Sequence, residues 1–114
     1  MSEDLDREEI WREFNEAVNM SPGELEDWLA TDESRSVGAK DEGDSEAVGH
    51  KSGRRIVAIK RKKKAELTGD DYRHMRKVAG FVHRHLAQGG PARDKEGSAW
   101  RYSLMNWGHD PLKS

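Results

Sequence analysis

The chain has 114 residues, which is enough for one small domain with a modest hydrophobic core. It contains no cysteine, which excludes disulfides and thiolate chemistry, and no run of the roughly 20 apolar residues that a membrane span needs. Residues 1–4 provide neither the basic region nor the apolar region of a signal peptide. We therefore expect an intracellular, cytoplasmic protein without a membrane partner.

The formal net charge of −2 hides an uneven distribution of charge along the chain. Residues 1–50 contain 4 Lys and Arg against 16 Asp and Glu, a net charge of −12, whereas residues 51–114 contain 16 against 6, a net charge of +10. This asymmetry predicts a basic surface that attracts an anion, with an acidic segment nearby. The alternative is that the two halves simply lie against each other.

Two helices are predicted in the acidic half. Residues 4–19 carry apolar side chains at spacings of three and four, which places these side chains on one face of a helix. A second helix is expected to begin at Ser21, whose side chain can cap it, with Pro22 in the first helical position and Glu24 completing a capping box. The tight turn between the two helices predicts an acidic helical hairpin over residues 1–31.

A flexible linker is predicted over residues 32–51. The stretch from 31 to 53 contains four Gly and four Ser, many acidic side chains and no periodic apolar pattern. We expect residues 32–50 to be mobile for the same reason.

Residues 52–114 are predicted to form a basic unit of three helices that ends in a Trp-rich segment. Ser52 can cap the first helix, although a strand over residues 56–59 is the alternative. Thr68 can cap the second and longest helix, which stops at the Gly89-Gly90-Pro91 breaker. The three predicted helices span residues 52–65, 68–88 and 98–107.

These elements predict an all-α protein, in which an N-terminal helical hairpin and a C-terminal three-helix unit are joined by the flexible linker. The four Trp residues fit the apolar stripes of the predicted helices, so we interpret them as core residues rather than as a surface that stacks on bases. These residues are Trp11, Trp28, Trp100 and Trp107.

No pattern in the sequence indicates catalysis or metal binding. The five His residues do not have the spacing of metal ligands, and Gly-rich phosphate loops are absent. Ser103, His109 and Asp110 can be drawn as a triad, but the chain has no nucleophile elbow and no oxyanion loop. His109 fits better as a residue that fixes a turn by hydrogen bonding. We therefore expect no catalytic residue, no metal, no cofactor and no small-molecule substrate.

The basic residues are the strongest functional signal. Eight of the fourteen residues from Lys51 to Lys64 are Lys or Arg. Further basic residues follow on the outer face of the longest predicted helix, with Arg76 and His83 one helical column away. This pattern is typical of proteins that bind the phosphate backbone of nucleic acids. The candidate nucleic-acid-binding residues are Arg54, Arg55, Lys60, Arg61, Lys62, Lys63, Lys64, Arg73, Lys77 and Arg84.

Several strings of the sequence also carry a family resemblance. They include Gly49 to Val57 (GHKSGRRIV), His74 to Val78 (HMRKV), Arg84 to Gln88 (RHLAQ) and Ser103 to Pro111 (SLMNWGHDP). Together with WREF at residues 11–14 and ELEDWL at residues 24–29, they resemble a family of small bacterial and fungal proteins catalogued as domain of unknown function 3140. The family has no established activity, and some members are labelled DNA-binding. The resemblance implies no catalytic residues and adds to the nucleic-acid interpretation.

The sequence thus favours a non-catalytic protein that binds nucleic acid, with DNA favoured, mostly through phosphates and with little sequence specificity. A DNA-binding role would associate the cytoplasmic protein with the nucleoid. The alternative is a protein–protein interaction adaptor, in which the acidic hairpin and the Trp-rich C-terminal end bind another chain, and an acidic protein is the alternative partner for the basic face. The two hypotheses differ in whether the basic residues form an exposed face or are covered by the acidic residues of the first half.

Overall fold

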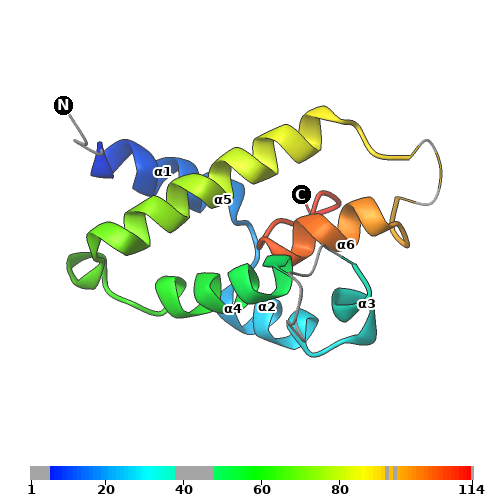
Figure 1. Ribbon diagram of the computed structural model, residues 1–114, viewed down its shortest axis with the longest axis horizontal. Coiled ribbons are helices and arrows are strands. Elements are labelled where there is room, and N and C mark those ends of the chain that lie inside the picture. The colour runs from blue at the N-terminus through cyan, green and yellow to red at the C-terminus, as the bar shows by residue number, and fades with distance from the viewer. Residues whose placement is uncertain (1–5, 38–47, 92, 94, 114) are drawn as a thin grey trace.

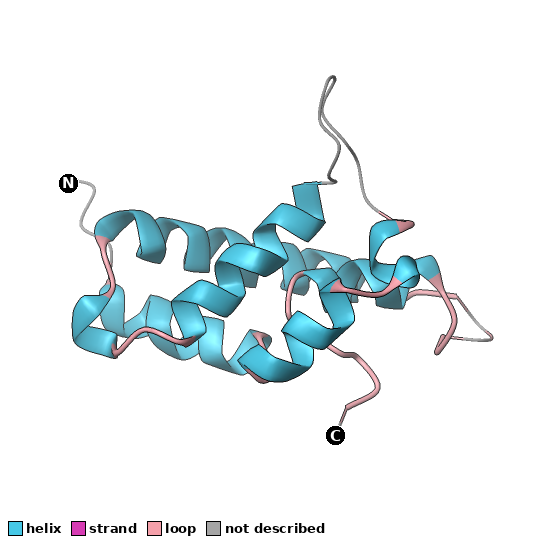
Figure 2. Ribbon diagram, turned by 90° about the horizontal axis from the view of Figure 1, so that it is seen from below, coloured by secondary structure: helices cyan, strands magenta, loops and turns pink. Residues whose placement is uncertain are grey.

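The computed structural model describes residues 6–37, 48–91, 93 and 95–113, and every regular element in these ranges is helical. The predicted all-α fold is therefore confirmed. Figure 1 shows α5 as the longest helix, and Figure 2 shows helices joined by loops, with a further loop that leads to the C-terminus. The elements in chain order are α1 (Arg7–Ala17), α2 (Pro22–Leu29), α3 (Asp32–Arg35), α4 (Val48–Lys60), the 3₁₀ turn η1 (Lys64–Glu66), α5 (Gly69–Ala87) and α6 (Ala99–Asn106).

The starts of α2 and α5 follow the capping signals of the sequence. The Ser21 hydroxyl accepts a hydrogen bond from the Glu24 backbone N–H, and the Glu24 carboxylate accepts one from the Ser21 N–H, which completes the predicted capping box of α2. Thr68 and Asp71 form the same reciprocal pair at the start of α5. Because each cap satisfies N–H groups that have no partner inside the helix, these starts are fixed locally.

The segment predicted as a linker is helical at both of its ends. Residues 32–35 form α3, where the Thr31 side chain accepts from the Ser34 N–H. Residues 48–51 belong to α4, so the helix expected to start at Ser52 starts four residues earlier and ends at Lys60. Ser52 lies inside α4 and is 4% exposed, so it is a buried helical residue and not a cap. Residues 38–47 of the expected linker lie outside the described residues.

The two N-terminal helices pack on helices from the other half of the chain. α1 lies along α5, and α2 lies along α4, while α6 contacts α2, α3, α4 and α5 (Figure 1). The apolar face predicted for the first helix is thus buried against α5. Acidic and basic halves are interleaved, which brings their charges close together.

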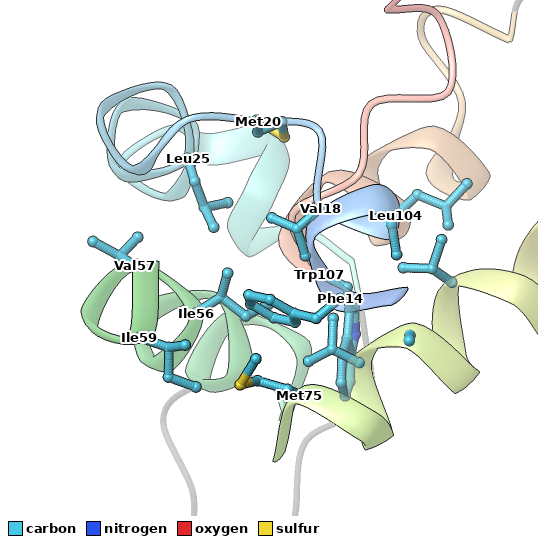
Figure 3. Close-up of a cluster of buried hydrophobic side chains, with 14 of the residues drawn as sticks. Phe14, Val18, Met20, Leu25, Ile56, Val57, Ile59, Met75, Leu104 and Trp107 are labelled. Atoms are coloured by element: carbon cyan, nitrogen blue, oxygen red, sulfur yellow. The ribbon is translucent and has the colours of Figure 1, made fainter. Parts of the chain in front are cut away.

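A single hydrophobic core joins five of the helices (Figure 3). Each of them supplies at least one apolar side chain that is at most 1% exposed, and burying such a side chain stabilises the fold by about 1.5–3 kcal/mol. Four of these helices have only 8 to 13 residues and would be marginal alone in water, so the shared core stabilises them. Examples, one from each helix, are Phe14 of α1, Leu25 of α2, Ile56 of α4, Met75 of α5 and Leu104 of α6.

The Trp residues pack on this core, as predicted. Trp107 is 6% exposed and belongs to the core, and Trp11, Trp28 and Trp100 are partly buried against it. Gly108 follows α6 with a φ of 84°, the left-handed conformation that favours glycine after a helix. In the described part of the chain, no helix is long and apolar enough to span a bilayer.

Candidate nucleic-acid interface

The outer face of α5 carries a group of exposed basic side chains. One side of α5 faces the core, and its buried residues there include Tyr72, Met75, Val78, Ala79 and Val82. The opposite side is exposed, and we call its basic residues the α5 basic face. With a rise of 1.5 Å per residue, this face extends about 16 Å along the helix. Its residues are Arg73, Arg76, Lys77, His83 and Arg84, all exposed.

Most of the α5 basic face has no acidic partner. Arg73 donates to the carboxylate of Asp70, one turn earlier, at 2.7 Å. Within the described ranges, Arg76, Lys77 and Arg84 make no ion pair with any acidic residue. A phosphate can therefore approach these three side chains without displacing a carboxylate of the described residues.

Part of the basic segment after α4 is covered by acidic residues of the first half. The Arg61 guanidinium donates to both carboxylate oxygens of Glu26, at 3.0 and 3.2 Å. The Lys64 ammonium donates to Glu8 and lies 4.5 Å from the centre of the Trp11 ring. These side chains remain about half exposed, so the pairs are surface contacts.

Arg55 and Lys62 neutralise a buried carboxylate. The side chain of Asp71 is 6% exposed, and its two oxygens lie 2.7 Å from Lys62 Nζ and 3.6 Å from Arg55 Nη2. Burial alone would raise the pKa of Asp71, but hydrogen bonds from Lys62 and Thr68 outweigh it and lower that pKa to about 2. Because Asp71 also caps α5, these two basic residues support the fold.

The other predicted basic residues lie in three different settings. Lys60 is half-buried, with Nζ 3.5 Å from Asn15 Oδ1, and burial together with the nearby Lys113 lowers its pKa. Lys63 is exposed and has no ion pair among the described side chains, and Arg54 is exposed on α4. Of the ten candidates, three thus lie on the α5 basic face, five contact partners inside the protein, and Arg54 and Lys63 are exposed outside that face.

The strings that carry the family resemblance build the interior. Asn106 is 1% exposed, and its Oδ1 accepts from Trp28 Nε1 at 2.7 Å and from Ser34 Oγ at 2.5 Å. Its Nδ2 donates to the Ser34 carbonyl at 3.0 Å. One buried amide therefore joins α6 to α2 and α3, and all three of these hydrogen bonds are made inside the protein.

The turn after α6 is fixed to the end of α1. A ring nitrogen of His109, Nδ1, is 2.7 Å from the Ala17 carbonyl oxygen, so His109 holds the turn by hydrogen bonding as predicted. The Asp110 carboxylate accepts two hydrogen bonds from Arg101, at 3.0 and 3.1 Å, and its backbone N–H donates to Asn19. Through these hydrogen bonds, His109 and Asp110 hold the turn after α6 in place.

Close packing explains the two glycines of the GHKSGRRIV string. A Cβ atom at Gly49 would lie 2.9 Å from Trp107 Nε1, and one at Gly53 would lie 2.5 Å from the Asn106 carbonyl oxygen. Only a side chain of one hydrogen allows α4 to approach α6 so closely. His50 of the same string, 8% exposed, contacts the Leu29 carbonyl at 2.7 Å through Nε2.

Five rings form a continuous stack between α5 and α6. Successive ring centres are 4.3 to 6.4 Å apart, and each pair is within about 16° of parallel. The faces of these rings therefore contact one another inside the protein. In order, the rings are His74, Trp107, Phe81, His85 and Trp100.

The described residues include no group of three or more His, Asp or Glu side chains that could hold a metal ion. Helical spacing in the sequence predicted an exposed basic face on this helix with Arg73, Lys77 and Arg84, but the candidate set did not include Arg76 and His83. It also missed Gly80, which lies at the centre of this face. The signal for all three was available in the spacing of three and four residues around position 80.

These features define a small all-α domain with a buried hydrogen-bond network and a basic outer helix. The chain belongs to the DUF3140 family of proteins of unknown function, whose family model matches residues 13–105. This match confirms the family resemblance of the sequence. No curated protein and no solved structure matches the chain.

Proposed function

We propose that this protein binds nucleic acid, with DNA favoured, through phosphate contacts made by the α5 basic face and with little sequence specificity. The observation that supports this proposal is the set of three exposed cations on one helix, Arg76, Lys77 and Arg84, without ion pairs in the described structure. Because the helix already fixes the backbone at these three positions, binding of a polyanion there requires no further ordering of the backbone. The proposal assigns the protein no catalytic role.

The overall charge of −2 does not oppose such binding strongly. At physiological ionic strength, exposed charges interact over a Debye length of about 8 Å, whereas α5 is about 28 Å long. A phosphate near the outer face of α5 is therefore affected mainly by the local basic residues. The acidic side chains that pair with Arg61 and Lys64 lie on α1 and α2.

The ion-paired cations can add to the interface at small cost. An exposed ion pair contributes about 0–1 kcal/mol, so phosphate can replace Glu26 at Arg61 or Glu8 at Lys64. Arg55 and Lys62 are different, because losing them would leave the buried Asp71 carboxylate without its partners. We therefore place the first two at the margin of the interface and the second two outside it.

The state of the aromatic rings favours double-stranded over single-stranded nucleic acid. Proteins that bind single strands stack successive bases on exposed aromatic side chains. In the described part of the chain, every Trp, Tyr and Phe side chain is at least partly buried, and the rings nearest α5 stack on one another. The phosphate backbone of a duplex requires no such stacking.

The same observation weakens the adaptor hypothesis. In that hypothesis, Trp100 and Trp107 at the C-terminal end of the chain bind another protein. Both side chains instead pack against the core, and Trp100 Nε1 donates to the His85 carbonyl. An acidic protein that binds the α5 basic face remains the competing partner. Such a protein would bind the same residues as DNA, so the two hypotheses differ in the partner and not in the binding site.

The test is to measure duplex binding of the full chain as a function of salt. Triple replacement of Arg76, Lys77 and Arg84 by Gln should flatten the slope of log K against log salt by about two to three units, because each phosphate contact contributes about −0.9. Fluorescence anisotropy with a labelled duplex at several salt concentrations gives this slope. The full chain is required, since residues 1–50 supply the core side chains Phe14 and Leu25.

A matched control removes the same amount of charge from ion-paired positions. Replacement of Arg61, Lys64 and Lys113 by Gln also removes three positive charges, but their partners are Glu26, Glu8 and Glu24. A phosphate that binds at Arg61 or Lys64 displaces a carboxylate, which then attracts a solvent cation itself, so we expect this variant to change the slope by less than about one unit. Equal slopes for the two triple variants would contradict the assignment to α5. Absence of duplex binding by the unmodified protein at low salt would refute the function itself.

A further inference from the structure

Gly80 lies at the centre of the α5 basic face and is surrounded by basic residues. On a helix surface, the neighbours of a residue are those three and four positions away. For Gly80 these are Arg76 and Lys77 on one side and His83 and Arg84 on the other, and all four are exposed. One residue without a side chain is therefore enclosed by four side chains that carry nitrogen donors.

The packing of the protein does not require a glycine at this position. A Cβ atom at Gly80 would meet one described atom within 4 Å, Arg84 Nη1 at 3.2 Å, which is the far end of a flexible side chain. At Gly49 and Gly53, by contrast, a Cβ would meet Trp107 and the backbone of Asn106. The backbone of Gly80 has no positive φ either.

Glycine in the interior of a helix has a stability cost. It is about 0.8–1 kcal/mol less favourable than alanine, because glycine loses more backbone freedom on folding. At position 80 no internal contact offsets this cost. A glycine inside a helix without such a contact suggests a close approach by something outside the protein.

We propose that the helix surface at Gly80 binds one phosphate group of a DNA duplex, at the point where a strand crosses α5. We call this phosphate-binding site the seat. This proposal rests on the proposed function and names the contact point. The missing side chain at position 80 lets the Arg84 guanidinium and the phosphate lie close to the helix surface, while Arg76 and Lys77 lie one turn to one side and His83 and Arg84 one turn to the other.

The chemistry of the four neighbours fits a phosphodiester. Arg76 and Arg84 present planar groups of N–H donors that can each bind two phosphate oxygens, and Lys77 adds a point charge. The Arg84 guanidinium already lies over Gly80, since its Nη1 is 3.2 Å from the position of an added Cβ. A larger residue at position 80 would displace both this guanidinium and the bound phosphate.

The experiment measures stability and duplex binding of the same variants. Gly80→Ala should raise the melting temperature by a few degrees, since alanine is the better helix former, and should weaken duplex binding. Gly80→Gln should weaken binding by at least about tenfold, the size expected for loss of one charge-assisted contact. A higher melting temperature together with weaker duplex binding in Gly80→Ala is the result that supports the seat.

Gly23→Ala is the matched control. Gly23 lies in α2 and is exposed, and a Cβ there would meet nothing within 4 Å. The variant should bind duplex as the unmodified protein does. If Gly80→Gln binds duplex with unchanged affinity, or if Gly80→Ala lowers the melting temperature, the seat is overturned while the proposed function stands. If the unmodified protein does not bind duplex, both fall together.

Discussion

Asn106 offers the sharpest test of the buried network that joins α6 to α2 and α3. In Asn106→Ala, the Trp28 indole N–H and the Ser34 hydroxyl lose their acceptor, and the Ser34 carbonyl loses its donor. A buried polar group without a partner costs about 1–3 kcal/mol. Because Trp28 is only partly buried, water can reach it, and we expect a total loss of about 3–5 kcal/mol. Urea denaturation followed by circular dichroism measures this loss as a change in the free energy of unfolding.

Asn106→Asp separates the hydrogen-bond donor from the shape of the side chain. The carboxylate keeps two acceptors but places an oxygen against the Ser34 carbonyl and buries a charge without a cation. Its pKa should be raised by burial, so its instability relative to the unmodified protein should shrink as pH falls and an O–H donor returns. Asn15→Ala is the control, since Asn15 is exposed and should change stability by less than about 0.5 kcal/mol. A loss below about 1 kcal/mol in Asn106→Ala would refute the structural role of the network.

Three further changes test other parts of the structure. Trp107→Ala should cost about 3–5 kcal/mol in urea denaturation, whereas Lys63→Ala should stay within about 0.5 kcal/mol, and equal losses would mean that Trp107 is not a core residue. Gly108→Ala should lower the melting temperature, because φ is 84° and an added Cβ would lie 2.8 Å from Val18; an unchanged value would contradict the left-handed turn. Burial, with Arg55 and Lys77 nearby, lowers the pKa of His74 from 6.5 to about 4, so the unfolded chain binds a proton first. Stability should therefore be complete above about pH 6.5 and fall as pH decreases toward 4, by about 1–3 kcal/mol, and His74→Gln should remove this part of the pH dependence of unfolding.

The helices could be predicted from the sequence, but their partners could not. Capping side chains and apolar spacing are local signals, which is why the starts of α2 and α5 were found at Ser21 and Thr68. The same signals show which face of a helix is apolar and not which helix covers it. The four-residue α3 is too short to show any period. The first turn of α4 contains Gly49, which reads as a linker residue until its contact with Trp107 is known.

The candidate site was predictable to a similar degree. Spacing alone placed Arg73, Lys77 and Arg84 on one exposed face. The basic run at residues 60–64 looked uniform in the sequence, but its partners come from three distant places. Lys62 pairs with a buried capping residue, Arg61 and Lys64 pair with acidic side chains of α2 and α1, and Lys63 makes no ion pair among the described residues. Such long-range pairs have no signal in a single sequence, so the division between paired and unpaired cations required the structure.

The hydrogen bonds between the end of α1 and the turn after α6 have a consequence for how the chain folds during synthesis. Asn19 and Asp110 exchange two hydrogen bonds across 91 residues, and His109 reaches Ala17 across 92. α1 therefore leaves the ribosome long before the residues that hold it in place, and its apolar face stays uncovered until α5 and the turn have followed. Contacts of such long range slow folding, so we expect this protein to fold more slowly than helical bundles built from local contacts. A chain that ends before Asn106 would contain every helix except a complete α6. It would lack Trp107 of the core and the turn that holds the end of α1.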